Sequence, residues 1–213
     1  METDAFLAEV RAANETALSR LGSSKSLYAF TDGELTATAV ASVAVNVSHT
    51  AAAALEAYAA DAATDEAADA FSAFGELSAA HAATAEGIAD DVPARERHDA
   101  VGALADYGDG SGASDVQRLG AVVGYALVAK KLAEQSTGFF TGEADPGTAS
   151  TFRSYGSDVD AQRDDVLAAL ASVVAGDDDR EAALAAASAV VQGAYEEYTA
   201  RLEAMGVNPK PVC

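Results

Sequence analysis

Apolar residues recur every three or four positions along most of the 213-residue chain, with polar and acidic residues between them. This spacing places the apolar side chains on one face of an α-helix. We therefore predict five long helices, over residues 33–62, 64–89, 114–141, 146–175 and 178–205. Strict alternation of apolar and polar residues, the pattern of a half-buried strand, is not found in the sequence.

Each predicted helix has a face that we expect to be buried. In the first two helices this face consists of Val40, Val43, Val47, Ala51, Ala54 and Tyr58, and of Phe71, Phe74, Ser78, His81, Ala85 and Ile88. In the next two it consists of Val122, Tyr125, Ala129, Leu132, Ser136 and Phe139, and of Phe152, Tyr155, Val159, Gln162, Val166, Leu170 and Val173. In the last helix it consists of Leu184, Val191, Tyr195, Tyr198 and Leu202.

Several helix ends are marked by residues that satisfy free backbone groups. Thr64 precedes two acids that suit a helix N-terminus. Ser114 is followed three positions later by Gln117, which is the spacing of a capping box. Pro146 follows Asp145, and proline is well tolerated at the first helical position because no hydrogen bond is lost there.

The segments outside the long helices are shorter and less regular. Residues 1–32 are predicted to hold an amphipathic helix from a cap at Thr3 to about Arg20, and then a polar connector. Residues 90–112 are charged and rich in glycine, and we predict a long crossover that carries one short helix. Residues 207–213 are predicted to form a tail.

Residues 33–206 are predicted to form one helical bundle. The helices over 33–62 and 64–89 are joined by a short loop, as are those over 114–141 and 146–175, and the longer connection separates the two pairs. This arrangement is typical of a ferritin-like four-helix bundle with one crossover. The predicted fold is therefore all-α, with an extra helix at each end of the bundle.

The composition adds a strong negative charge. The chain has 34 acidic and 13 basic residues, a net charge of −21 and a pI near 4.2. Such acidity is typical of proteins from a salt-saturated cytoplasm, where salt screens the repulsion and the carboxylates keep the surface hydrated. Lys130 and Lys131 are the only adjacent basic pair. Because binding to nucleic acid needs a clustered basic face, we predict no direct contact with it.

The sequence predicts a cytoplasmic protein without a membrane span. No run approaches the length of about 18 apolar residues that a spanning helix needs. The opening residues METDAFLAEV lack the basic and then apolar order of a signal peptide. The single cysteine, Cys213, excludes a disulfide within the chain.

Bundles of this topology hold two metal ions through an inward Glu from each of two helices and a Glu-x-x-His motif from each of the other two. The residues three positions before His49, His81 and His98 are Asn46, Ser78 and Arg95. None of these is an acid, so the sequence predicts no di-iron centre and no metal ligands. It also has no recognisable nucleophile with a base, and the GDGSG run at 108–112 lacks the preceding strand of a phosphate loop. We therefore predict no catalytic residues and no cofactor.

His81 is the histidine that the predicted registers place on a core face. We interpret it as a core histidine that is hydrogen-bonded by Ser78 or Gln162. The alternative is a non-standard metal site of His81, Glu76 and Glu134, which requires the helix registers to be shifted by one or two residues. The same shift would turn one of Asp158 and Asp160 inward.

Three passages carry a resemblance to a known family: LGSSKSLYAFTDGE, GFFTGEADPGTASTFR and YEEYTARLEAMGVNPKPVC. Through them the chain resembles a family of haloarchaeal proteins of about this length that look like degenerate relatives of the rubrerythrin and ferritin-like bundle. Some members carry a label that ties them to transcription antitermination.

We therefore predict a halophilic, non-enzymatic helical bundle with an interaction or regulatory role, and the resemblance implies that this role is in transcription. It implies a protein partner, such as the transcription machinery. The alternative is a rubrerythrin-like, metal-dependent oxidoreductase. The chain departs from the rubrerythrin ligand pattern at each histidine, which favours the non-enzymatic interpretation.

Overall fold

All regular structure in the described part of the chain is helical. The computed structural model describes residues 1–89, 92, 96–108 and 111–209. The long helices are α4 (Ala37–Ala60), α5 (Asp65–Glu86), α7 (Asp115–Gly142), α8 (Pro146–Val173) and α9 (Asp177–Ala204). The shorter elements are α1 (Thr3–Ala13), α2 (Glu15–Leu21), α3 (Ser24–Phe30), the 3₁₀ turn η1 (Asp99–Val101) and α6 (Gly102–Ala105). The prediction of an all-α protein is confirmed for these residues.

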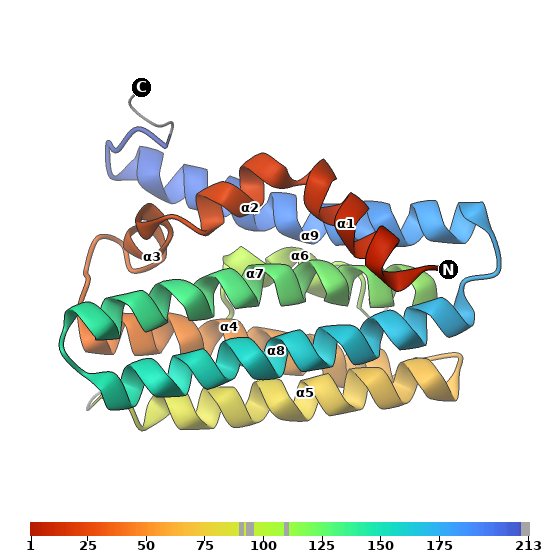
Figure 1. Cartoon of the computed structure of the whole chain (residues 1–213), viewed down its shortest axis with the longest axis horizontal. Coiled ribbons are helices and arrows are strands. Elements are labelled where there is room, and N and C mark those ends of the chain that lie inside the picture. Colours follow the sequence, from red (N-terminus) through yellow and green to blue (C-terminus); the bar gives the residue numbers. More distant parts are fainter. Residues whose placement is uncertain (90–91, 93–95, 109–110, 210–213) are drawn as a thin grey trace.

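The long helices lie roughly parallel or antiparallel to one another. Helices α4 and α5 form one hairpin and α7 and α8 form a second, and the two hairpins meet where α5 lies beside α8 (Figure 1). Helix α9 packs along α7, and α1, α2 and α3 all contact α9. The described part of the crossover holds one short helix, α6, preceded by η1, as predicted.

The helix caps that the sequence predicts are present. The Thr64 hydroxyl accepts a hydrogen bond from the Ala67 amide at 3.4 Å. Ser114 and Gln117 form the reciprocal capping box at the start of α7. Asp145 Oδ1 accepts from the Thr148 amide at 3.0 Å, with proline at the first position of α8.

The prediction of one helix over residues 3–20 is wrong, because the helix is interrupted at Asn14. The Asn14 amide donates to the Val10 carbonyl at 2.8 Å and to Ser188 Oγ at 3.0 Å, and its oxygen accepts from Gln192 at 2.7 Å. A side chain that binds its own backbone competes with the helix ladder. The Asn14 side chain also connects this interruption to α9 through its bonds with Ser188 and Gln192. Thr3 is the first residue of α1 and not its cap.

The prediction of a polar connector after this helix is also wrong, since residues 24–30 form α3. Its Leu27 and Phe30 lie three positions apart and are both buried. Helix α3 ends where Asp32 and Gly33 adopt positive φ values of 50° and 84°. This left-handed turn delays the start of α4 to Ala37, four residues later than the predicted start at 33.

Helix α7 is the central element of the molecule. Nearly every residue from Asp115 to Val128 is buried, because α8 and α9 cover different sides of it. The predicted extra C-terminal helix is therefore part of the packed core. A Cβ built on Gly120 would lie 2.3 Å from the Ala183 carbonyl oxygen, and one on Gly124 would lie 2.3 Å from that of Ala187. Only glycine permits this approach of α7 to α9.

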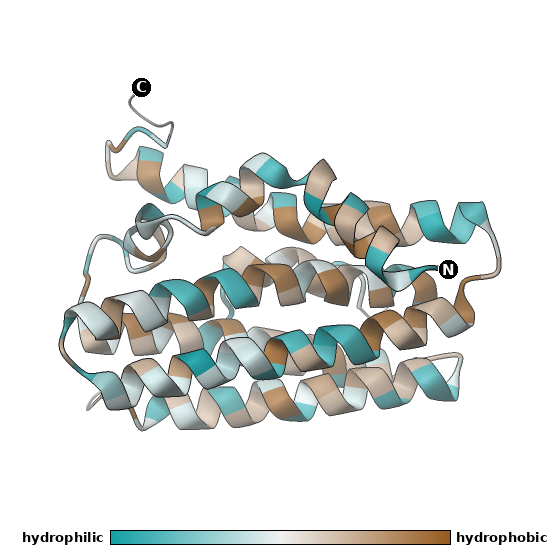
Figure 2. Ribbon diagram, viewed as in Figure 1, coloured by the Kyte–Doolittle hydropathy of each residue, from teal (hydrophilic) through white to brown (hydrophobic). Residues whose placement is uncertain are grey.

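The predicted buried faces are largely correct. All six positions predicted on α4 are buried. Helix α4 is also the one helix in the described chain that is long and apolar enough to cross a membrane, but 56% of its most apolar stretch is buried inside the protein. That is the pattern of a core helix. Figure 2 shows the contrast with the first turn of α9, which carries three aspartates and is strongly hydrophilic.

Candidate functional site

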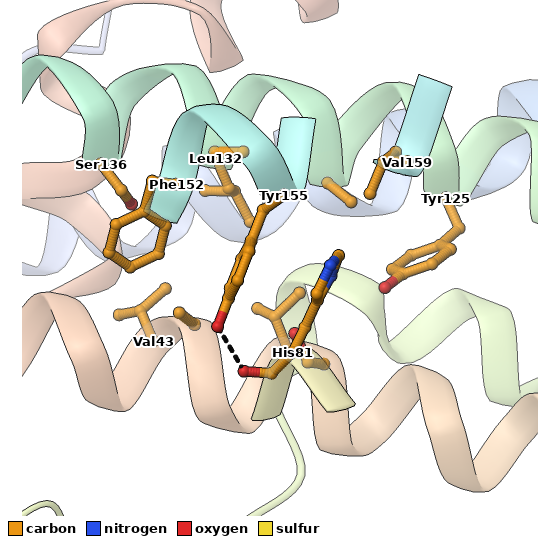
Figure 3. A pocket seen from close by; sticks show the side chains of 13 residues that line it. Val43, His81, Tyr125, Leu132, Ser136, Phe152, Tyr155 and Val159 are labelled. Atoms are coloured by element: carbon orange, nitrogen blue, oxygen red, sulfur yellow. Dashed lines mark hydrogen bonds between the residues drawn. The ribbon is translucent and has the colours of Figure 1, made fainter. Parts of the chain in front are cut away.

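The interior of the two hairpins contains a small cavity, which we call the seam cavity. It is lined by residues of α4, α5, α7 and α8 (Figure 3). The walls are mostly apolar, with Val43, Val47, Leu132 and Val159 among them. Its volume is about 40 Å³. A cavity needs roughly 10–15 Å³ per water, so this one has room for a few waters and not for an organic cofactor.

His81 reaches this cavity from α5. Its ring stacks on that of Tyr155, with the ring centres 3.9 Å apart and the planes 11° from parallel. The Tyr155 hydroxyl donates a 2.7 Å hydrogen bond to the His81 carbonyl, the dashed line in Figure 3. Through these two contacts α8 holds the backbone and the ring of His81 at once.

The polar partner of His81 is Asp158, and not Ser78 or Gln162 as predicted. His81 Nε2 lies 3.4 Å from Asp158 Oδ2, at the long end of hydrogen-bond distance. Ser78 Oγ is instead 3.4 Å from the Tyr125 hydroxyl. The Gln162 side-chain oxygen is buried without a hydrogen-bond partner in the described chain.

Burial dominates the electrostatics of the cavity. Desolvation lowers the pKa of His81, and the Asp158 hydrogen bond and charge oppose that shift only in part. His81 is therefore neutral at pH 7. Burial likewise raises the pKa of Tyr125 to about 12 and that of Tyr155 to about 12. The titratable groups that line the cavity are thus neutral, and the carboxylate beside His81, Asp158, lies at the protein surface with 44% of its side chain exposed.

The structure does not bring the alternative metal ligands together. Glu76 is exposed on a different face of α5, in a groove beside α4. Glu134 is exposed on α7 and pairs with Lys131 at 2.9 Å. Neither lines the seam cavity with His81. Asp160 is also directed elsewhere, since it pairs with Lys130 at 2.7 Å.

The side chains at the seam do not fit a di-iron centre. Such a centre needs several carboxylates to balance the metal charge, and this wall offers one imidazole with one partly exposed carboxylate beside it. In the part of the chain that the structure describes, no three His, Cys, Asp or Glu side chains gather as a metal-binding group. Cys213 and Arg95 lie outside the described residues.

The hydroxyl groups at the cavity offer hydrogen bonding and no nucleophile. Ser48 and Ser136 line it and are buried, yet among the described residues neither is bonded to His81. A serine needs a base within hydrogen-bond reach to act as a nucleophile. The geometry therefore suits a packed polar cluster that fixes the contact of α5 with α8.

Comparison with known proteins places no relative beside this chain: no family model, no curated protein and no solved structure gives a significant match.

Proposed function

We propose that this protein is a non-enzymatic, cytoplasmic interaction protein with a regulatory role, built on a ferritin-like bundle and adapted to high salt. Transcription antitermination is the process that we propose for it, on the resemblance of its sequence to haloarchaeal rubrerythrin-like proteins. The observation that carries the proposal is the wall of the seam cavity, where valine and leucine occupy the central layer of the two hairpins.

The ferritin-like assignment is supported by the arrangement of the helices. Helices α4 and α5 are joined by a short turn, α7 and α8 are joined by another, and the crossover between residues 87 and 114 links the two hairpins. This order of close pairs around one long connection is the one expected of such bundles. Helix α9 and the three N-terminal helices are additions to it.

Metal content tests the non-enzymatic part of the proposal. The protein should be purified in about 2 M KCl, so that its acidic surface is screened, and analysed by mass spectrometry for iron and manganese. We expect far less than one metal ion per chain. The matched control is His81→Gln, which removes the histidine that lines the cavity. One or more ions per chain in the wild type, lost in His81→Gln, would overturn the proposal in favour of a metal enzyme.

A pull-down tests the regulatory part. Tagged protein should be recovered from its own cell extract at molar salt, and the retained proteins identified. We expect subunits of the transcription machinery, enriched over a tagged helical protein of similar charge. If those subunits are not enriched over the control, transcription is the wrong process.

A further inference from the structure

A second hollow, which shares only Val43 with the described lining of the seam cavity, contains hydrogen-bond donors that have no partner among the described residues. It lies where the end of α3, the turn at 31–36, the first half of α4 and residues 96–98 meet, beside Arg201 of α9. We call it the polar groove. In Figure 1 this is the end of the molecule where α3 leads into α4. Its volume, about 440 Å³, lies within the range of small-molecule sites.

The floor of the polar groove contains a histidine with an unused nitrogen. His98 is 94% buried, with 6% of its surface exposed, and packs edge-on against Phe30 with 5.5 Å between ring centres. Its Nδ1 accepts a hydrogen bond from the Ala100 amide at 3.2 Å. Burial, with Arg201 nearby, lowers the pKa of His98 to about 4, so the ring is neutral and the proton is on Nε2. Within the described chain Nε2 has no acceptor.

Two further donors line the same groove. Asn46 uses its oxygen to accept from the Glu96 amide at 2.9 Å, which leaves its NH₂ group without a partner in the described chain. Arg201 donates from Nε to Glu197 and from Nη1 to Asp32 at 3.1 Å. Its Nη2 forms no hydrogen bond with the described residues. These three donors line one groove, and a ligand that supplies an acceptor group could pair with them in place of solvent.

The charges that line the groove indicate which other group the ligand carries besides an acceptor. Among the described residues of the groove, Asp32, Glu34 and Glu96 are exposed at its rim and outnumber the cations, Arg97 and Arg201. A simple anion would meet net negative charge there, whereas a ligand that also carries a cation would be attracted. Phe30 and Val43 add an apolar wall.

We propose that the polar groove binds a free α-amino acid with a small apolar side chain, of the size of valine. Its carboxylate accepts hydrogen bonds from His98, Asn46 and Arg201, its ammonium group faces the acids at the rim, and its side chain lies against Phe30 and Val43. This binding activity goes beyond the proposed interaction role and does not depend on it.

The test uses the full chain and three matched probes. L-valine carries both charged groups, isovalerate lacks the ammonium group, and isobutylamine lacks the carboxylate. Binding should be measured by calorimetry and by the rise in melting temperature, at constant high salt. We expect saturable binding of L-valine and at least about tenfold weaker binding of either single-charge analogue, since each omits a charge-assisted contact.

Two conservative variants test the assigned donors. Asn46→Asp keeps the oxygen that accepts from the Glu96 amide and turns the donor NH₂ into a negative oxygen. His98→Asn keeps an acceptor for the Ala100 amide and removes the Nε2 donor. We expect each to weaken binding of L-valine by about tenfold or more. The control is Gln117→Glu, which adds the same charge as Asn46→Asp at the capping box of α7, far from the groove, and should bind L-valine normally.

Three results of these binding experiments would contradict different parts of the proposal. Equal binding of L-valine and isovalerate would overturn the amino-acid assignment in favour of a carboxylate site. Equal loss in Gln117→Glu and Asn46→Asp would overturn the assigned contacts. Absence of saturable binding to the folded wild type at concentrations on the order of 10 mM would overturn the proposal outright. The metal content of the protein bears on the proposed function and leaves this result unchanged.

Discussion

At the scale of single residues, His98 gives stability a pH dependence. Its pKa is lowered from 6.5 to about 4 by burial and by Arg201, against the smaller effects of Asp99 and Asp32. Between these two pH values the unfolded chain binds a proton that the folded chain does not. The free energy of unfolding therefore falls as the pH is lowered from 6.5 to 4, by up to about 3 kcal/mol from this one residue.

His98→Asn isolates this contribution, because asparagine can accept from the Ala100 amide and does not titrate. We expect the wild type to lose about 3 kcal/mol more than the variant between pH 7 and pH 4. Urea unfolding at a series of pH values, at constant salt, measures the difference. The 34 acids titrate in both proteins, so they cancel in the comparison. Parallel pH curves would show that His98 is not the source.

Arg118 is the second residue whose role depends on burial. Its side chain is 3% exposed and donates to the carbonyls of Tyr107 at 3.1 Å and Asp61 at 3.0 Å, and to the Asp61 carboxylate. Arg118→Met would leave these acceptors without a donor, and we expect a loss of about 2–4 kcal/mol in the free energy of unfolding by urea. Arg153→Met, at an exposed position of α8, should change it by less than about 0.5 kcal/mol. Similar losses in both would refute the assignment.

The sequence alone does not predict most of these side-chain contacts. The face of His81 was predicted correctly, but its partner Asp158 lies 77 positions away and one position before the predicted stripe residue Val159. The sequence alone does not indicate the role of His98, because its cap on η1 and its position in the polar groove depend on how the crossover folds. The apolar lining at Val47, Leu132 and Val159 could be predicted, because it follows from helical periodicity alone.

At the scale of helices, the contact of α7 with α9 depends on glycine. Gly120→Ala would place a methyl group 2.3 Å from a backbone oxygen that cannot move alone, and we expect a loss of about 1–3 kcal/mol or more. Gly138, on the same helix, has no atom within 4 Å of its added Cβ. Gly138→Ala should therefore gain about 1 kcal/mol through helix propensity. Urea unfolding of both variants is the test, and changes of the same sign would contradict the close packing.

The helix ends that were predicted correctly are those determined by residues close to them in the sequence. Thr64, the Ser114–Gln117 pair and Pro146 act on backbone groups within one turn, so no knowledge of the fold was needed. The break at Asn14 could not be predicted in this way, because it is held by Ser188 and Gln192 of α9. The central place of α7 was also missed, because a helix covered on several sides has no single apolar face for periodicity to reveal.

At the scale of the whole molecule, the net charge of −21 opposes the compact state at low salt. Raising KCl from about 0.1 M to about 1 M shortens the screening length from about 10 Å to about 3 Å. We expect the melting temperature to rise by roughly 5–10 °C, which corresponds to a few kcal/mol for a chain of this size. Circular dichroism during thermal unfolding measures it.

A charge-reduced variant separates screening from general effects of salt. Asp165→Asn, Glu181→Gln and Glu203→Gln neutralise three exposed acids that form no ion pair within the described chain. The combined variant should gain less from the added salt than the wild type. An equal gain would indicate that the salt acts on hydration of the apolar surface instead.

The dependence of the N-terminal helices on α9 has a consequence for synthesis. Helices α1 to α3 leave the ribosome before α9, yet several groups that hold them lie on α9, including Ser188, Gln192 and the Arg180 that pairs with Glu9. The two hairpins can assemble while elongation continues. The leucine and phenylalanine side chains of α1 to α3 therefore remain exposed to water until α9 has been synthesised.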